Sequence, residues 1–250
     1  MGARDNGDPF GRSLQPTADG GPNGVPIITI DGPSGSGKGT VARLVATRLG
    51  WHLLDSGALY RLVAFAGMKR GTAPDDESAH AQIARDLDAT FGVGPDGQER
   101  IWLEGTEVSR DIRSEQAGAG ASRVAVMPTV RDGLLERQRA FARPPGLVAD
   151  GRDMGTVVFP GAGLKIFLTA APEVRALRRY NQLKDKGLDA NLAALSLEIA
   201  ERDRRDASRA VAPLKPAADA VIVDSTSMPI ESVVARVLEL AAVRFPVKTH

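Results

Sequence analysis

A short apolar run near the N-terminus leads directly into a glycine-rich segment containing a lysine: Ile27-Ile28-Thr29-Ile30-Asp31 precedes Gly32-Pro33-Ser34-Gly35-Ser36-Gly37-Lys38-Gly39-Thr40. The apolar run is typical of a buried strand, and the residues after Thr40 continue as a helix. Glycines let successive backbone N–H groups turn towards one anion, and a helix start adds partial positive charge. With Lys38 in register to reach phosphate oxygens, the segment predicts a loop that binds a nucleoside triphosphate.

The spacing matches the phosphate-binding P-loop pattern at all but one position. Gly32, Gly37 and Lys38 fall where the pattern requires them, but Gly39 follows the lysine and the hydroxyl comes one residue later, at Thr40. In the common pattern the hydroxyl directly after the lysine binds magnesium, so the residues alone leave the magnesium ligand open. The alternative is a plain glycine-rich turn between a strand and a helix.

Length, composition and charge limit the remaining possibilities. The chain has 250 residues, 42% of them hydrophobic, enough for one α/β domain with an insertion or for two small domains. It has no cysteine, which excludes disulfides and thiolate metal sites. The 32 basic and 31 acidic residues give no general attraction to nucleic acid or membrane surfaces, and no signal peptide or membrane span is evident. We therefore expect a cytoplasmic protein with no nucleic-acid or membrane partner.

The rest of the chain alternates short apolar runs with helical patterns. Residues 1–24 contain too few apolar side chains to become ordered, which predicts a flexible tail. Besides the first strand and the helix that ends at residue 49, we expect strands at 51–55, 146–150, 164–168 and 220–224, a helix from the second strand to about residue 69, and helices at 76–87, 114–126, 128–142, 172–186, 189–209 and 229–243. Within this pattern, Ala89–Val93 and Arg100–Leu103 predict a hairpin around Gly94-Pro95-Asp96-Gly97.

Two predicted strands end in polar residues at the edge where parallel sheets bind ligands. The second strand ends in Asp55-Ser56-Gly57, and the third ends in Asp150-Gly151-Arg152-Asp153-Met154-Gly155. Asp and Ser are also ordinary helix N-caps, so the first group has a structural alternative. Arg152 has no capping role, which favours ligand binding at the second group.

The densest charge cluster covers residues 201–209, Glu-Arg-Asp-Arg-Arg-Asp-Ala-Ser-Arg. It is either a solvated helix with internal ion pairs or a face that closes over polyphosphate, because Arg202, Arg205, Asp206 and Arg209 share one helical face. Phosphoryl transfer requires such positive charge around the transferred group. The three histidines, at positions 52, 80 and 250, are scattered and support neither a metal cluster nor a histidine base. A phosphate acceptor is already anionic and needs no strong base.

Four segments, in this order, resemble the bacterial cytidylate kinase family. They are Ile-Asp-Gly-Pro-Ser-Gly-Ser-Gly-Lys-Gly-Thr at 30–40, Leu-Leu-Asp-Ser-Gly-Ala-Leu-Tyr-Arg at 53–61, Ala-Asp-Gly-Arg-Asp-Met-Gly-Thr-Val-Val-Phe-Pro at 149–160, and the cluster continued by Ala-Val-Ala-Pro-Leu to residue 214. The resemblance covers about residues 26–243, and Gly-Lys-Gly-Thr is the P-loop form that nucleoside monophosphate kinases use.

The resemblance implies an α/β P-loop NTPase fold with a five-stranded parallel sheet flanked by helices. The kinase domain would cover 25–245, with a monophosphate-binding insertion at 68–143 that carries a small antiparallel β-meander, and a short helical lid at 180–212. The implied reaction is ATP-dependent phosphorylation of CMP and dCMP in pyrimidine nucleotide metabolism. Weaker use of UMP, Mg²⁺ as cofactor and a monomeric state are also implied.

Matched positions assign roles to individual residues. The ATP phosphates would contact the loop from Gly32 through Pro33, Ser34, Gly35, Ser36, Gly37, Lys38 and Gly39 to Thr40. The acceptor's sugar and phosphate would contact Ser56, Tyr60, Arg61, Arg152, Arg202, Asp206 and Arg209, and cytosine would contact Ser122, Arg131 and Asp153. The catalytic group would be Lys38, Arg152, Arg205 and Arg209, with Arg205 facing the transferred phosphoryl group. Mg²⁺ would be held mainly by phosphates and water, with Thr40 as the candidate protein ligand.

Three alternatives stay open. Asp153 is either a reader of the base or a structural partner of Arg131 or Arg152. A P-loop kinase for shikimate or adenylate would share the phosphate loop but not the Gly-Arg-Asp-Met-Gly segment with the arginine face. A regulatory GTPase would need an Asn/Thr-Lys-x-Asp motif to read guanine, and the sequence has none.

Overall fold

The computed structural model describes residues 24–94, 99–185, 187, 189–209 and 211–246. Residues 1–23 of the predicted tail lie outside this part of the chain. So do Pro95, Asp96 and Gly97 of the predicted hairpin turn.

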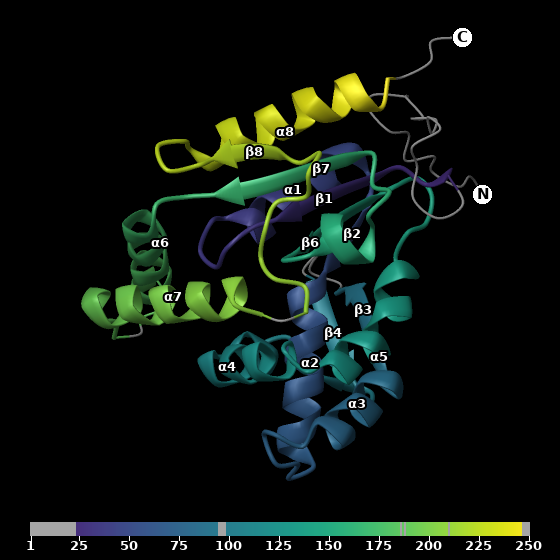
Figure 1. Cartoon of the computed structure of the whole chain (residues 1–250), viewed down its shortest axis with the longest axis vertical. Helices are drawn as coiled ribbons and strands as arrows, with labels where there is room; N and C mark the ends of the chain where they lie inside the picture. Colours follow the sequence, from purple (N-terminus) through teal and green to yellow (C-terminus); the bar gives the residue numbers. More distant parts are fainter. Residues whose placement is uncertain (1–23, 95–98, 186, 188, 210, 247–250) are drawn as a thin grey trace, which may run out of the picture.

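A five-stranded parallel sheet forms the centre of the molecule, with strand order β2-β6-β1-β7-β8 (Figure 1). The strands are Ile27–Asp31 (β1), His52–Asp55 (β2), Leu147–Gly151 (β6), Leu164–Thr169 (β7) and Val221–Asp224 (β8). Every pair of neighbouring strands is parallel. The predicted fold class, an α/β fold built on a five-stranded parallel sheet, is therefore confirmed.

The central strand β1 is buried on both faces, which explains its unbroken apolar sequence. Ile28 and Ile30 pack in a core with helices α1 (Lys38–Leu49) and α8 (Ile230–Arg244), while Ile27 belongs to the core on the other face. Each of these side chains is fully buried, which stabilises the fold by about 1.5–3 kcal/mol per residue. This packing fixes the end of β1, from which the glycine-rich loop starts.

The second core joins the sheet to a helical region with its own small sheet, in the lower part of Figure 1. The helices are α2 (Ser56–Lys69), α3 (Glu77–Arg85), α4 (Glu115–Val124) and α5 (Pro128–Arg139). The strands Ala89–Val93 (β3), Glu99–Leu103 (β4) and Thr106–Glu107 (β5) form an antiparallel meander. The predicted hairpin and the small antiparallel sheet are confirmed, whereas the boundaries of the insertion and the lid stay predictions.

Two further helices, α6 (Pro172–Asp185) and α7 (Leu192–Ala207), lie to one side of the sheet in Figure 1. The predicted helix at 189–209 was too long at both ends. The Asn191 side chain accepts a 3.0 Å hydrogen bond from the Ala194 N–H and so caps the start of α7, and the helix ends at Ala207, so Arg209 is not on the predicted helical face. Asp76 and Ser114 likewise precede α3 and α4 as caps. No helix within the described ranges is long and apolar enough to cross a membrane.

Two short elements were not predicted: a 3₁₀ turn at Asp111–Arg113 (η2) and a π-helical turn at Met154–Val158 (η3). The carboxylate of Asp31, at the end of β1, accepts hydrogen bonds from the Met154 and Gly155 N–H groups at 2.9 and 2.8 Å. Asp31 therefore holds the start of η3, directly after the polar end of β6.

Candidate active site

The glycine-rich loop runs from the end of β1 to the start of α1, with a backbone that only glycine fits. Gly32 has φ 154°, and a Cβ there would lie 2.0 Å from the Leu168 carbonyl oxygen. Gly37 has φ 91° and occupies the N-cap position of α1 without a side-chain capping bond. The first N–H groups of α1 are therefore available to an anion.

Three cationic side chains bind carbonyl oxygens of the loop. Arg175 of α6 donates to the Ser34 carbonyl at 3.0 Å, and Arg178 donates to the Ser36 carbonyl at 3.3 Å. Lys38 donates to the Pro33 carbonyl at 3.1 Å. With these carbonyls bound by side chains, the N–H groups of the loop stay available to a phosphate.

Asp150, at the end of β6, lies against the start of α1. Its Oδ1 atom is buried and has no hydrogen-bond partner among the described residues, and its Oδ2 atom would lie 3.1 Å from a Cβ at position 39. Gly39 therefore leaves room for the Asp150 carboxylate, which a larger residue after Lys38 would crowd. Burial raises the pKa of Asp150 and lowers the pKa of Lys38, while the charge of each group opposes the shift of the other.

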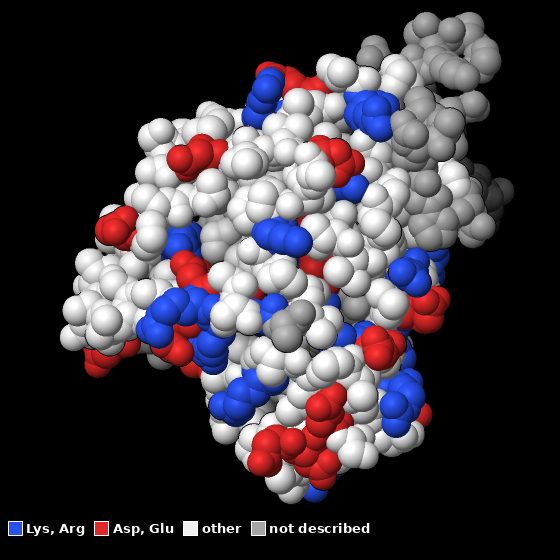
Figure 2. Space-filling view, in the orientation of Figure 1, with Lys and Arg blue, Asp and Glu red and all other residues white. Residues whose placement is uncertain are grey.

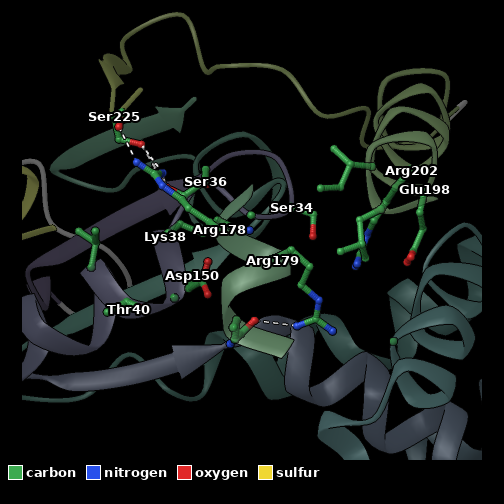
Figure 3. Close-up of a pocket in the computed structure, with 18 of the residues that line it drawn as sticks. Ser34, Ser36, Lys38, Thr40, Asp150, Arg178, Arg179, Glu198, Arg202 and Ser225 are labelled. Carbon is green, nitrogen blue, oxygen red and sulfur yellow. Dashed lines mark hydrogen bonds between the residues drawn. The ribbon is translucent and has the colours of Figure 1, made fainter. Parts of the chain in front are cut away.

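The loop borders a cavity of about 840 Å³ that extends to α6, α7 and the segment after β8. Figure 3 shows Glu198 and Arg202 of α7 across the cavity from Thr40 and Ser225. The predicted loop residues from Ser34 to Thr40 line this cavity, together with Arg205. Gly32 and Pro33, at the start of the loop, are buried and do not line it.

A smaller cavity of about 220 Å³ adjoins the first and contains most of the predicted acceptor residues. Its lining includes Ser56, Tyr60, Arg61, Ser122, Arg131, Arg152, Asp153, Arg202 and Arg209. Lys38, Asp150 and Arg202 line both cavities. The two cavities therefore share a wall with cations and a carboxylate, next to the glycine-rich loop.

Asp206 does not line the small cavity but connects two arginines that do. Arg152 donates from Nε to Oδ2 of Asp206 at 2.9 Å, and Arg209 pairs with Oδ1. Burial opposes ionisation of Asp206, but the charges of Arg152 and Arg209 outweigh it and hold the pKa of this carboxyl below its usual value. Asp206 of α7 thus partly neutralises Arg152 and Arg209, the latter lying just beyond the end of the helix.

Two guanidinium groups in this region each have an N–H donor that is not used. The Nε atoms of Arg202 and Arg209 are buried and have no partner among the described residues. Burial, with the nearby charge of Arg152, lowers the pKa of Arg202 to about 10, so this side chain is still cationic at neutral pH. Buried cationic donors without partners are suited to an anion such as a phosphate group.

Within the lining of the small cavity, Arg131 and Asp153 form an ion pair. Arg131 also donates to the Ala125 carbonyl at 3.3 Å and lies 5.9 Å from the centre of the Tyr60 ring. The Ser122 hydroxyl donates to the Gly118 carbonyl at 3.2 Å. Donor and acceptor groups that can read a planar base therefore lie together beside an aromatic ring.

The comparison with protein families agrees with this geometry. The family model for cytidylate kinase matches residues 28–243. The chain belongs to the cytidylate kinase family. A cytidylate kinase from Pseudomonas paraeruginosa is 62% identical over 215 residues, covering 86% of this chain and 94% of the relative. One from Azotobacter vinelandii is 60% identical over 219 residues, covering 87% and 96%.

Among solved structures, a gluconokinase from Sinorhizobium meliloti 1021 aligns with 88% of this family member and 93% of its own chain. Its identity is 18% and the TM-score is 0.44, a likeness too low to add to the family assignment.

The larger cavity of this cytidylate kinase family member is also lined by several residues that were not predicted from the sequence. Arg178 donates to the Ser225 hydroxyl at 3.1 Å and to its carbonyl at 2.6 Å, and closes the end of the cavity where Met228, Pro229 and Ile230 also lie. A signal was available, because Ser225 directly follows the last strand, at the same sheet edge as the other two polar strand ends. Asp150 was noted at its strand end but given no role.

Proposed function

We propose that this protein transfers the γ-phosphoryl group of ATP to the phosphate of CMP or dCMP, giving ADP and CDP or dCDP. The observation that carries the proposal is the wall shared by the two cavities, where Lys38, Asp150 and Arg202 meet beside the glycine-rich loop. Two phosphorylated ligands bound in adjoining cavities would bring their phosphates together there. The family assignment supports the same reaction.

The larger cavity is suited to ATP. Its triphosphate would lie along the loop from Ser34 to Thr40, with Lys38 on the β- and γ-phosphates. The adenine would extend towards the end lined by Arg178, Met228 and Ile230, which offers a guanidinium plane and apolar side chains. Arg205, which lines only this cavity of the two, would face the transferred group.

The smaller cavity is suited to the acceptor nucleotide. Arg152, Arg202 and Arg209 would hold its phosphate, and Asp206 would keep two of these guanidiniums oriented. Ser56, Tyr60 and Arg61 line the same space and would contact the sugar and phosphate. The attacking phosphate oxygen is already anionic, so positioning and charge stabilisation supply the catalysis rather than a general base.

The residues present also fit Mg²⁺. The described residues contain no cluster of three or more acidic or histidine side chains able to hold a metal ion alone, so phosphates and water would supply most ligands. The buried, unpartnered Oδ1 of Asp150 and the side chain of the exposed Thr40, which both line the larger cavity, would complete the shell. The ion would neutralise charge on the β- and γ-phosphates.

Base selection would rest on Asp153, Arg131 and Ser122. A carboxylate can accept from the exocyclic amine of cytosine, and a guanidinium can donate to its ring acceptors. Uracil offers a carbonyl where cytosine offers the amine, so UMP would be a weaker substrate. The same groups give no reason to accept shikimate, the acceptor of a rival P-loop kinase.

A panel of acceptors tests the proposal directly. CMP, dCMP, UMP, AMP, GMP and shikimate would each be incubated with ATP and MgCl₂, and the formation of ADP and of the phosphorylated acceptor would be measured. We expect CMP and dCMP to have the highest kcat/KM, UMP a lower value, and the others almost none. A preference for AMP or shikimate would contradict the proposal, and size-exclusion chromatography would test the expected monomer.

A further inference from the structure

One acidic residue of the 201–209 cluster, Asp203, forms its ion pair with another helix. Asp206 faces Arg152 and Arg209, and Glu201 forms pairs within α7, with Arg204 at 2.5 Å and Arg205 at 3.9 Å. Asp203 instead reaches across to α6, where Arg175 donates to its two carboxylate oxygens at 3.0 and 2.5 Å. Figure 2 shows basic and acidic side chains interleaved over α7, in keeping with these pairs.

Arg175 is more than a surface partner of α7. Its side chain is only 4% exposed, and its Nε and Nη1 atoms donate to the carbonyls of Ala170 and Ser34, each at 3.0 Å. The loop lies directly on this residue, since a Cβ at Gly35 would be 3.0 Å from the Arg175 Cβ. One guanidinium therefore binds the phosphate loop, the end of β7 and α7 at once.

The bidentate geometry of the Arg175–Asp203 contact fixes how the two side chains are oriented. A guanidinium that binds a carboxylate through two parallel N–H groups fixes orientation as well as distance, and a lysine cannot replace it. Arg202 is the neighbour of Asp203 on α7 and lines both cavities. A shift of α7 relative to the loop would therefore move Arg202 relative to both phosphates.

We propose that Arg175 and Asp203 are positioning residues that couple the phosphate loop to the arginine face of α7. Phosphates bound in the loop fix Ser34, Ser34 fixes Arg175, and Arg175 fixes α7 with its guanidiniums in place for the acceptor. Occupation of the donor cavity by ATP then strengthens acceptor binding, and by linkage the acceptor strengthens ATP binding by the same factor. The inference rests on the proposed function, because it takes the two ligands to be ATP and CMP.

A purely structural role predicts a different result. If the pair only packs α7 on α6, its loss lowers the melting temperature and weakens each ligand's binding without changing how one affects the other. The factor by which a bound ATP analogue changes CMP affinity therefore separates the two roles.

The experiment measures the CMP dissociation constant by calorimetry, with and without saturating Mg²⁺ and a non-hydrolysable ATP analogue. The test variant is Asp203→Asn, which keeps the side-chain shape but loses the charge and one acceptor. The matched control is Glu201→Gln, which changes an ion-paired acid of the same helix whose pairs stay within α7. A second test variant, Arg175→Lys, keeps the positive charge but cannot bind Ser34 and Asp203 through one fork.

We expect the analogue to tighten CMP binding by about fivefold or more in the wild type and in Glu201→Gln. In Asp203→Asn and in Arg175→Lys, we expect the factor by which the analogue tightens CMP binding to fall towards one, and kcat to fall as well. CMP affinity measured without the analogue should change little. Asp203→Glu, which restores the carboxylate, regains part of the factor.

A factor equal to that of the wild type in a folded Asp203→Asn variant would overturn the proposal, as would a factor of one in the wild type. If Asp203→Asn does not fold, the same criterion applies to Arg175→Lys and Asp203→Glu. Failure of the wild type to bind CMP at all would instead overturn the proposed function.

Discussion

Asp153 and Arg131 form an ion pair inside the smaller cavity, where their side chains are 4% and 8% exposed. This pair is compatible with both interpretations of Asp153, as a reader of the base and as a structural partner of Arg131. Asp153 orients Arg131, and the Asp153 carboxylate lines the cavity in which we propose that the acceptor base is read. A measurement of substrate preference rather than of stability alone is needed to separate the two roles.

Replacing Asp153 with alanine should reduce the discrimination between CMP and UMP. The carboxylate gains a charge-assisted hydrogen bond from the cytosine amine and meets a lone pair of uracil. Loss of such a bond at a buried site costs about 1–3 kcal/mol, or roughly 5- to 150-fold in kcat/KM. We expect Asp153→Ala to lose CMP activity by this amount and UMP activity much less.

The stability of the same variant must be measured alongside. Removing one partner of a buried ion pair leaves Arg131 uncompensated, which costs about 3–5 kcal/mol of unfolding free energy. Asp153→Asn, of the same volume, should retain more stability than Asp153→Ala. A lower stability with an unchanged CMP to UMP ratio would make Asp153 a scaffold residue only.

Lys38→Ala should abolish most turnover while leaving the fold intact. The only hydrogen bond that the structure gives the Lys38 ammonium among the described residues is to the Pro33 carbonyl, so the protein loses little when it is removed. In the working complex the ammonium would meet developing charge on the transferred phosphoryl group, a contact worth at least about 10²–10³ in kcat. Near-normal turnover, with an unchanged circular dichroism spectrum and melting temperature, would contradict the role of the loop.

Much of the architecture was predictable because its causes are local. β1, β6 and β7 are largely apolar runs since they are buried on both faces, and the loop glycines are required where the backbone takes a positive φ. The polar residues at two strand ends do lie together in one cavity, because parallel strands deliver their carboxyl ends to one edge.

The parts that were not predictable depend on contacts between distant segments. Asp31 ends a strand, and nothing near it in the sequence indicates that it holds the backbone of Met154 and Gly155, more than a hundred residues later. Arg175 and Asp203 are separated by 28 residues on different helices. Helical periodicity places each on a face but does not say which helix that face meets.

Gly39→Ala should lower activity without lowering stability. The residue is helical, and alanine is favoured over glycine there by about 0.5–1 kcal/mol, but its Cβ would lie 3.1 Å from Oδ2 of Asp150. The carboxylate must shift by a few tenths of an ångström, away from where we place Mg²⁺. We expect a lower kcat and a higher half-saturating Mg²⁺ concentration.

Gly161→Ala is the matched control for this substitution, because a Cβ at Gly161 would have nothing within 4 Å. Gly161→Ala should leave kcat and the half-saturating Mg²⁺ concentration unchanged. Equal Mg²⁺ dependence in Gly39→Ala and the wild type would show that the space beside Asp150 has no part in metal binding.

The titration of Asp31 should contribute to the pH dependence of the unfolding free energy. Burial is the main cause that raises the pKa of this carboxyl from 3.8 to about 6, although the Gly155 and Met154 N–H groups oppose the shift. Between these values the folded protein holds more protons at this site than the unfolded chain, so the contribution of Asp31 to unfolding free energy is greatest below about pH 4 and falls as the pH rises through 6. A shift of this size corresponds to about 3 kcal/mol.

Asp31→Asn removes this titration, although it also loses one of the two N–H acceptors and should be less stable by a constant amount. The unfolding free energy of the variant minus that of the wild type should therefore rise by about 2–3 kcal/mol between pH 4 and pH 7. Urea denaturation at matched ionic strength across this range measures the difference, in which other titrating groups cancel. A difference that stays flat with pH would mean that Asp31 ionises normally in the folded protein, and a difference that falls would reverse the sign of its burial effect.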